Sequence, residues 1–281
     1  MRSNWMIAGL LLCTSLVFAQ EQTTPPAPAA PRQAALPKPV EKTLENGLRV
    51  IVVPKTGVPL VSARLMVMTG SERDTAPLAG LASLTASLVT EGTRTRSSEQ
   101  IDRGVEALGA TLRSNVGWGE STVAVNVMSP RFNEALMFVA DVVRNPSFKQ
   151  EEIDRVRAQA IDAVQVSLQD PAALARRVAA RVIFRGEPYG PSESGTPESL
   201  QRIQREQIVA FHQKHYTPDN AVLVIAGDIK PAAAFATAEK LFGTWKRGNR
   251  GNVVTIELRR PAEPVKPPVV GIDMPAAGQG A

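Results

Sequence analysis

The sequence predicts an α+β fold, a two-layer sandwich in which helices cover a mostly antiparallel sheet. Two observations support this prediction. Short apolar strand patterns occur as hairpin-like pairs, most clearly at residues 111–116 and 121–128 around Gly117-Trp118-Gly119-Glu120. Helical patterns also follow one another without an intervening strand between residues 131 and 215. Hairpins combined with consecutive helices favour an α+β domain over a regularly alternating parallel α/β sheet.

The elements follow in order along the chain from residue 49. We expect strands at residues 49–53, 61–68, 111–116, 121–128 and 221–226, and helices at residues 77–89, 101–108, 131–144, 151–169, 171–184, 197–203, 204–215 and 232–242. The first two strands are adjacent in sequence, so we expect them to pair. Ser97 and Gln100 have the spacing of a capping box and start the second helix, which Gly109 ends.

Composition indicates an ordinary globular protein. The chain has 281 residues, of which 43% are hydrophobic and 21% charged, enough for one large or two small domains. The net charge is +5, which a solvated surface rich in arginine explains. Aromatic residues make up only 5%, and no basic cluster is interleaved with them, so we expect no nucleic-acid partner.

Residues 1–19 have the pattern of a secretory signal peptide. Arg2 supplies the positive charge, residues 5–17 form a short apolar core, and Ala19 is a small residue at a plausible cleavage point. The apolar core is too short to span a bilayer, so we expect no transmembrane segment after cleavage. Lipidation at Cys13 is the alternative, although Leu12 is larger than the residue that usually precedes a lipidated cysteine.

Cleavage after Ala19 would leave a mature chain without cysteine, and therefore without disulfides or thiol chemistry. We expect an exported bacterial protein, periplasmic or extracellular. Residues 20–40 are rich in Pro and Ala and predict an extended linker, so that the folded domain spans residues 41–246.

The segment 80–93 has the frame of an inverted zinc-protease helix but not its metal ligands. That motif, H-x-x-E-H, places two histidine ligands and a general-base glutamate on one helical face. The corresponding residues here are Ser83, Ala86 and Ser87. None of them is a zinc ligand, and Ala86 cannot move a proton.

The same segment resembles the signature helix of the insulinase/pitrilysin/mitochondrial-processing-peptidase family of zinc metallopeptidases, with Gly80-Leu81 before it and Glu91-Gly92-Thr93 after it. Four more segments are similar to landmarks of the family's N-terminal domain, in the right order: residues 43–50, 67–73, 188–196 and 216–228. They correspond to an opening hairpin, a strand that ends in Gly-Ser, a Pro-Tyr-Gly loop and a Tyr-x-Pro-x-Asn strand.

The resemblance implies the metallohydrolase fold shared by LuxS and the processing peptidases, in an inactive variant. The family's third zinc ligand is a glutamate on a later helix, and that position falls at Ala163. Asp162 is adjacent but about 100° around the helix, so we expect it to face elsewhere. With Ser83, Ala86, Ser87 and Ala163 at the four key positions, we expect no zinc cofactor and no activity of the chain alone.

Other candidate groups have ordinary structural interpretations. His212 and His215 are three residues apart and could share a metal, but a role near the end of their helix is the competing interpretation. A serine nucleophile at Ser83 or Ser87 would need a base and an oxyanion hole. Neither histidine is near these serines in the family's layout, so we expect packing roles for both serines.

The resemblance also implies a surface that binds extended peptides. Family members add peptide to an edge strand beside the zinc helix, which corresponds here to Ser114, Asn115, Val116, Gly117 and Trp118. An ordinary strand of the sheet is the alternative. We expect proline at Asn115 to weaken peptide addition by removing a backbone donor.

We therefore predict a peptide-binding partner subunit of an active zinc-peptidase homologue. The alternatives are a scaffolding subunit of an exported complex and an active peptidase of unrecognised mechanism. Residues 247–268 predict a linker, and residues 269–279 resemble the first strand of the family's second, homologous domain, which would make residues 247–281 a linker and the start of a truncated domain. A disordered tail is the alternative.

Overall fold

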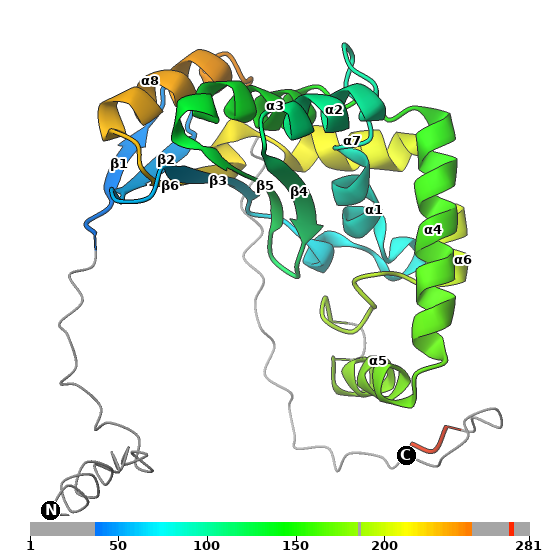
Figure 1. Cartoon of the computed structure of the whole chain (residues 1–281). Helices are drawn as coiled ribbons and strands as arrows, with labels where there is room; N and C mark the ends of the chain where they lie inside the picture. Colours follow the sequence, from blue (N-terminus) through cyan, green and yellow to red (C-terminus); the bar gives the residue numbers. More distant parts are fainter. Residues whose placement is uncertain (1–36, 185–186, 249–269, 273–281) are drawn as a thin grey trace, which may run out of the picture. The chain divides into compact units, whose positions relative to one another are not determined.

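A computed structural model describes residues 37–184, 187–248 and 270–272 of the chain. Its centre is a six-stranded sheet in the order β1-β2-β6-β3-β5-β4 (Figure 1). The strands are β1 (Val40–Thr43), β2 (Arg49–Pro54), β3 (Leu60–Val67), β4 (Thr111–Val116), β5 (Ser121–Met128) and β6 (Ala221–Gly227). All neighbouring strands are antiparallel except β2 and β6, which are parallel. The predicted sheet, mostly antiparallel, is therefore confirmed.

The expected pairing of residues 49–53 with residues 61–68 is wrong, because β6 lies between β2 and β3. Val50 of β2 is opposite Leu223, and Leu65 of β3 is opposite the same residue from the other side. The continuously apolar run of β6 gains two hydrogen-bonded neighbours in this central position. Nothing in the local pattern of residues 49–68 could show that a strand from much later in the chain separates them.

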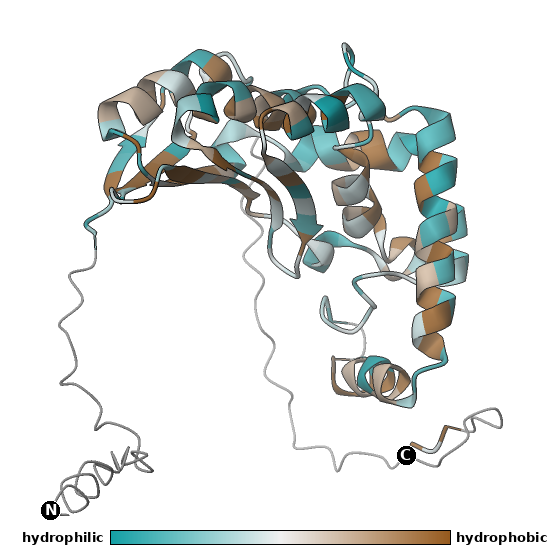
Figure 2. Cartoon of the chain, in the orientation of Figure 1, coloured by the Kyte–Doolittle hydropathy of each residue, from teal (hydrophilic) through white to brown (hydrophobic). Residues whose placement is uncertain are grey.

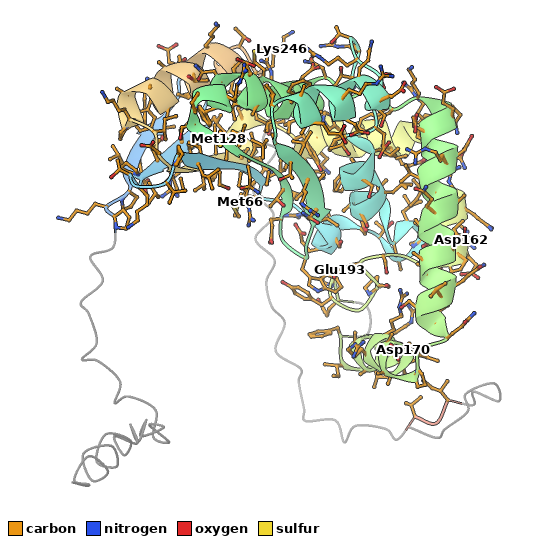
Figure 3. The ribbon with its side chains drawn as sticks, viewed as in Figure 1. Met66, Met128, Asp162, Asp170, Glu193 and Lys246 are labelled. Carbon is orange, nitrogen blue, oxygen red and sulfur yellow. The ribbon has the colours of Figure 1, made fainter. Side chains whose placement is uncertain are left out.

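One face of the sheet carries the core. In β3 the side chains of Val61, Ala63, Leu65 and Val67 are buried, whereas those between them are mostly exposed. Helices α3 (Phe132–Arg144) and α8 (Pro231–Phe242) pack on the buried face (Figures 1 and 2). This arrangement forms the two predicted layers. The opposite face carries partly exposed side chains such as Met66 and Met128 (Figure 3).

The remaining helices lie beside β4 and beyond it. They are α1 (Leu81–Leu88), α2 (Ser98–Ala107), α4 (Gln150–Leu168), α5 (Pro171–Phe184), α6 (Pro197–Arg202) and α7 (Arg205–His215). The predicted continuous helix over residues 77–89 is wrong: a short 3-10 turn, Ala76–Leu78, precedes α1. Gly80 separates the two with a φ of 92°, a left-handed conformation that glycine adopts readily.

The predicted signal peptide and most of the linkers lie outside the described residues. The chain contains no helix, within the ranges that the structure describes, that is long and apolar enough to cross a membrane. The signal peptide (1–19), the linker (20–40) and the second-domain start (247–281) stay predictions.

Candidate functional site

A buried carboxylate fixes the start of helix α1. The two oxygens of Asp74 accept hydrogen bonds from the backbone nitrogens of Gly80 (2.9 Å) and Ala82 (3.0 Å). These are among the amides at a helix start that have no partner within the helix. Burial raises the pKa of the Asp74 carboxyl to about 7, against the opposing effect of these backbone bonds.

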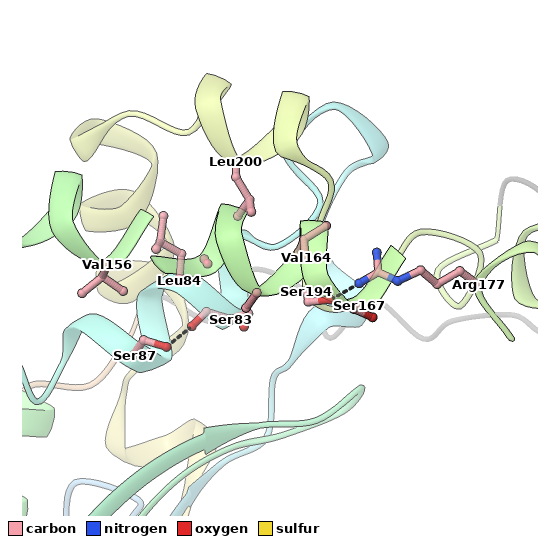
Figure 4. A pocket seen from close by; sticks show the side chains of 11 residues that line it. Ser83, Leu84, Ser87, Val156, Val164, Ser167, Arg177, Ser194 and Leu200 are labelled. Carbon is pink, nitrogen blue, oxygen red and sulfur yellow. Dashed lines mark hydrogen bonds between the residues drawn. The ribbon is translucent and has the colours of Figure 1, made fainter. Parts of the chain in front are cut away.

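Helices α1 and α4 enclose a pocket of about 370 Å³ at the positions that the family helix would use (Figure 4). Ser83 and Ser87 of α1 and Ala163 of α4 all line it. The structure thus brings together three of the four key positions. Ala86, the fourth, is only 2% exposed and is not among the lining residues. Asp162 is exposed on α4, outside this lining, as its position around the helix predicts (Figure 3).

The lining does not fit a zinc ion. It consists of four serines, one arginine and six apolar side chains, without an imidazole, thiol or carboxylate. Protein zinc sites use nitrogen, sulfur and carboxylate ligands. Across the described part of the chain, no group of three or more His, Cys, Asp or Glu side chains is arranged to hold a metal ion. The Ser87 hydroxyl donates to the backbone oxygen of Ser83 (3.1 Å), one turn earlier on α1.

Two polar residues in the pocket come from parts of the chain that sequence analysis did not connect with it. Arg177 of α5 donates to the Ser194 hydroxyl (2.8 Å) and to the backbone oxygen of Gly195 (3.1 Å). Both Arg177 and Ser194 line the pocket. Burial lowers the pKa of Arg177 from its ordinary, very high value, and an arginine still keeps its charge at neutral pH. No short motif marks these residues, because they approach α1 only through the fold.

The two histidines point to different partners and do not form a shared site. The Nε2 atom of His212 lies 2.8 Å from the backbone oxygen of Val143, and Nδ1 of His215 lies 3.5 Å from the Thr69 hydroxyl. The His212 ring also stacks on Tyr216, with ring centroids 4.6 Å apart. Burial lowers the pKa of each histidine to about 4. Both are therefore neutral packing residues near pH 7, and do not support the helix end as charged groups.

Strand β4 is an edge of the sheet, as expected for the peptide-binding strand, and α1 packs beside it. The backbone nitrogen of Gly117 donates to the oxygen of Glu120 (2.8 Å), and the β4–β5 register places Asn115 opposite Thr122. Hydrogen-bonded pairs alternate along an antiparallel ladder, so Asn115 faces β5 and Ser114 and Val116 face the free edge. Proline at Asn115 would thus disturb the β4–β5 ladder rather than the free edge.

The end of the expected binding stretch already has partners. The backbone oxygens of Gly117 and Trp118 accept hydrogen bonds from the nitrogens of Ser71 and Glu72, both at 3.0 Å. The Trp118 ring contacts Tyr189 edge-on, with centroids 5.2 Å apart. Of the five expected residues, Ser114 and Val116 therefore present free-edge backbone groups, whereas Gly117 and Trp118 join the hairpin to neighbouring loops.

Comparisons with known proteins agree with this architecture. The family model described as insulinase (peptidase family M16) matches residues 49–196, and the model of the peptidase M16 inactive domain matches residues 202–278. The second match begins inside the expected 41–246 domain, although β6 and α8 within it complete the same sheet layer.

Individual relatives are similar over most of this chain. An uncharacterized zinc protease of Rickettsia bellii is 26% identical over 74% of the chain and 51% of its own length. A probable mitochondrial-processing peptidase subunit beta of Arabidopsis thaliana is 25% identical over 71% of the chain and 38% of its own length. The crystal structure of a protease from Helicobacter pylori aligns with a TM-score of 0.75 at 20% identity, covering 79% of this chain and 54% of that one. The chain thus spans about half the length of the Rickettsia and Helicobacter proteins and a smaller part of the Arabidopsis protein.

Proposed function

This chain belongs to the insulinase family of peptidases, and we propose that it is a non-catalytic member that binds peptide as the partner subunit of an active zinc peptidase. The observation that carries the proposal is the lining of the α1–α4 pocket. Ser83, Ser87 and Ala163 lie where the family resemblance expects two histidines and a glutamate. A water activated by zinc is the nucleophile in such peptidases, and these three side chains cannot hold the ion.

The free edge of β4 supports the peptide-binding part of the proposal. Addition of a strand uses backbone donors and acceptors, so it does not depend on the side chains lost from the pocket. The outward backbone groups of Ser114 and Val116 lie on the strand beside α1. A peptide held there in extended form would have its backbone paired while a partner supplies the zinc.

The partner role is supported by the relatives. A similar protein is named as one subunit of a processing peptidase. A zinc-bearing homologue is therefore the proposed partner. Because residues 1–19 have the pattern of a signal peptide, the proposed location of the complex is the periplasm or the cell exterior.

A mixed peptidase assay tests the partner role. The chain is combined with a zinc-bearing homologue, and the peptide cleavage rate is measured with wild-type protein, with Ser114→Pro and with Ser114→Thr. Proline removes a free-edge donor, so the rate should fall while the complex persists in size-exclusion chromatography. Threonine keeps the donor and should preserve the rate.

Three outcomes would contradict the proposal in different ways. If the homologue cuts equally well with wild-type protein, with Ser114→Pro and alone, the accessory role is wrong and a scaffolding role is favoured. If the purified chain cleaves peptides without a partner, the non-catalytic assignment is wrong. If N-terminal sequencing of material from the cell envelope or medium begins at Met1 instead of near Gln20, the export prediction is wrong.

A further inference from the structure

The pocket between α1, α4 and α5 has chemistry of its own. Its lining side chains in α4 run from Val156 to Ser167. At 1.5 Å per residue, this stretch of helix is about 16 Å long. Leu84 and Val156 lie toward one end, and Ser167, Ser194 and Arg177 lie toward the other (Figure 4). The first end is largely apolar, with Ser87 as its polar residue, and the second end is polar and positively charged (Figure 4).

The Arg177 guanidinium at the polar end has unused donors. It makes two hydrogen bonds, to Ser194 and Gly195, out of five N–H groups. Within the ranges that the structure describes, no Asp or Glu forms a salt bridge with it. The hydroxyl of Ser167 also faces the pocket without a hydrogen-bond partner among the described residues. A partly buried cation without a counter-charge is the usual setting for a carboxylate or phosphate, which guanidinium binds with two parallel bonds.

We propose that this pocket binds the C-terminal residue of a peptide, with its carboxylate on Arg177 and an apolar side chain against the accessible Ala160 and Ala163 of α4. The largely buried Leu84, Val156, Val164 and Leu200 form the apolar floor beneath them. The volume of about 370 Å³ leaves room for a residue rather than a bare ion. This inference rests on the proposed peptide-binding function, because it names the part of the peptide that the vacated site recognises. A former zinc pocket thereby becomes a pocket for a peptide end.

A paired-peptide binding experiment tests the proposal on the full chain. The probe is a fluorescein-labelled hexapeptide that ends in leucine, either as the free acid or as the C-terminal amide, and affinity is read by fluorescence anisotropy. The free acid should bind about ten- to a hundredfold more tightly, as expected for hydrogen bonds to a charged group. Arg177→Gln should remove this preference, whereas Arg176→Gln, on the exposed neighbour, should keep it.

Arg177→Gln also removes the hydrogen bonds to Ser194 and Gly195, so a second variant is needed to separate the loss of charge from a change in that loop. Ser167→Asp leaves both Arg177 hydrogen bonds in place and adds a negative charge at the polar end, so it should also remove the preference for the acid. Thermal unfolding of each variant verifies the fold. Ser114→Pro should weaken acid and amide equally, because the strand binds backbone rather than the peptide end.

Equal binding of acid and amide by the wild type would overturn the pocket assignment and leave peptide binding on β4 intact. If inorganic phosphate binds to the wild type but not to Arg177→Gln, and the acid and amide peptides bind equally, the proposal is wrong. The pocket would then be a site for free phosphate. Absence of binding by either peptide would overturn both this inference and the proposed function.

Discussion

The sheet layer and the α1–α4–α5 pocket are built from different kinds of residues. In the sheet layer, α3 buries seven of its 13 residues, among them Phe132 and Leu136. Around the pocket, α1 buries six of its eight residues, whereas α4 buries three of its 19 and α5 buries none of its described residues. Small and polar side chains such as Ser83 and Ala163 line the pocket where the family resemblance expects larger ones.

This difference shows how the fold can persist without zinc ligands at Ser83, Ala86, Ser87 and Ala163. The apolar contacts of the sheet layer stabilise the fold, and each buried side chain there contributes to the free energy of unfolding. The partly or fully exposed Ser83, Ser87 and Ala163 contribute little to that free energy, so these positions are free to change. The apolar residues behind them, such as Leu84 and Leu200, are buried and belong to the core. The following predictions test this division, from the largest expected effect to the smallest.

The largest effect should come from a core aromatic. Phe132→Ala, at a side chain only 2% exposed, should lower the free energy of unfolding by about 3–5 kcal/mol through lost burial and a cavity. The matched control is Phe184→Ala on α5, a side chain 41% exposed, which should cost less than about 1 kcal/mol. Urea unfolding measures both. Equal losses would contradict the division between the two regions.

The next effect should be a pH dependence of stability that arises from the buried His212 of α7. The pKa of His212 is about 4 in the folded chain and about 6.5 when unfolded, so the neutral ring is favoured by folding. The contribution of His212 to the free energy of unfolding is therefore fully present above pH 6.5 and is lost as the pH falls toward 4. The full loss is roughly 3 kcal/mol at 1.36 kcal/mol per pKa unit.

Urea unfolding at pH 7 and pH 4.5 checks this prediction with wild type and His212→Gln. Asp74 acts in the opposite direction, because its raised pKa of about 7 favours the fold at low pH, but it is present in both proteins. The variant should therefore lose less stability on acidification than the wild type. An identical loss in the two proteins would show that His212 is not held neutral.

A smaller effect should come from the start of α2. The Ser97 hydroxyl accepts from the Gln100 nitrogen (3.2 Å), and the Gln100 side chain accepts from the Ser97 nitrogen (2.9 Å). Ser97→Ala should cost about 1 kcal/mol by removing this cap. Thermal unfolding detects the loss, and Ser97→Thr, which keeps a hydroxyl, should lose less. If Ser97→Ala left the stability unchanged, the Ser97 cap would not contribute to the stability of α2.

The smallest effect should come from the pocket itself. Ser83→Ala removes a hydroxyl that makes no hydrogen bond within the described residues and should change the free energy of unfolding by less than about 0.5 kcal/mol. Urea unfolding beside Phe132→Ala measures the difference directly. A loss above 2 kcal/mol would show that the serine has become part of the stabilising core.

Local sequence patterns predicted most helices and strands, because their signals lie within a few residues, but they missed strand β1 (Val40–Thr43). The capping box at Ser97 and the hairpin of β4 and β5 were both predicted and are confirmed. The pairing of β2 and β3 could not be predicted correctly, since the separating strand, β6, begins at Ala221. The insertion of β6 between β2 and β3 depends on tertiary packing, which no local pattern encodes.

The site was predictable only in part for the same reason. The family frame predicted the positions of Ser83, Ser87 and Ala163, and the structure places these residues around one pocket. Arg177 and Ser194 reach that pocket from α5 and the following loop, with no motif to connect them to α1. Asp74 caps α1 from six residues before Gly80, farther away than the usual capping patterns.

The zinc content of the purified chain tests the central claim most directly. After dialysis, metal analysis should find well under one zinc per chain, because Ser83, Ala86, Ser87 and Ala163 provide no ligand. The fourfold variant Ser83→His, Ala86→Glu, Ser87→His and Ala163→Glu shows whether the frame can still hold the ion, although ligands also need supporting contacts. One tightly held zinc in the wild type, lost on substitution of His212 or His215, would contradict the account.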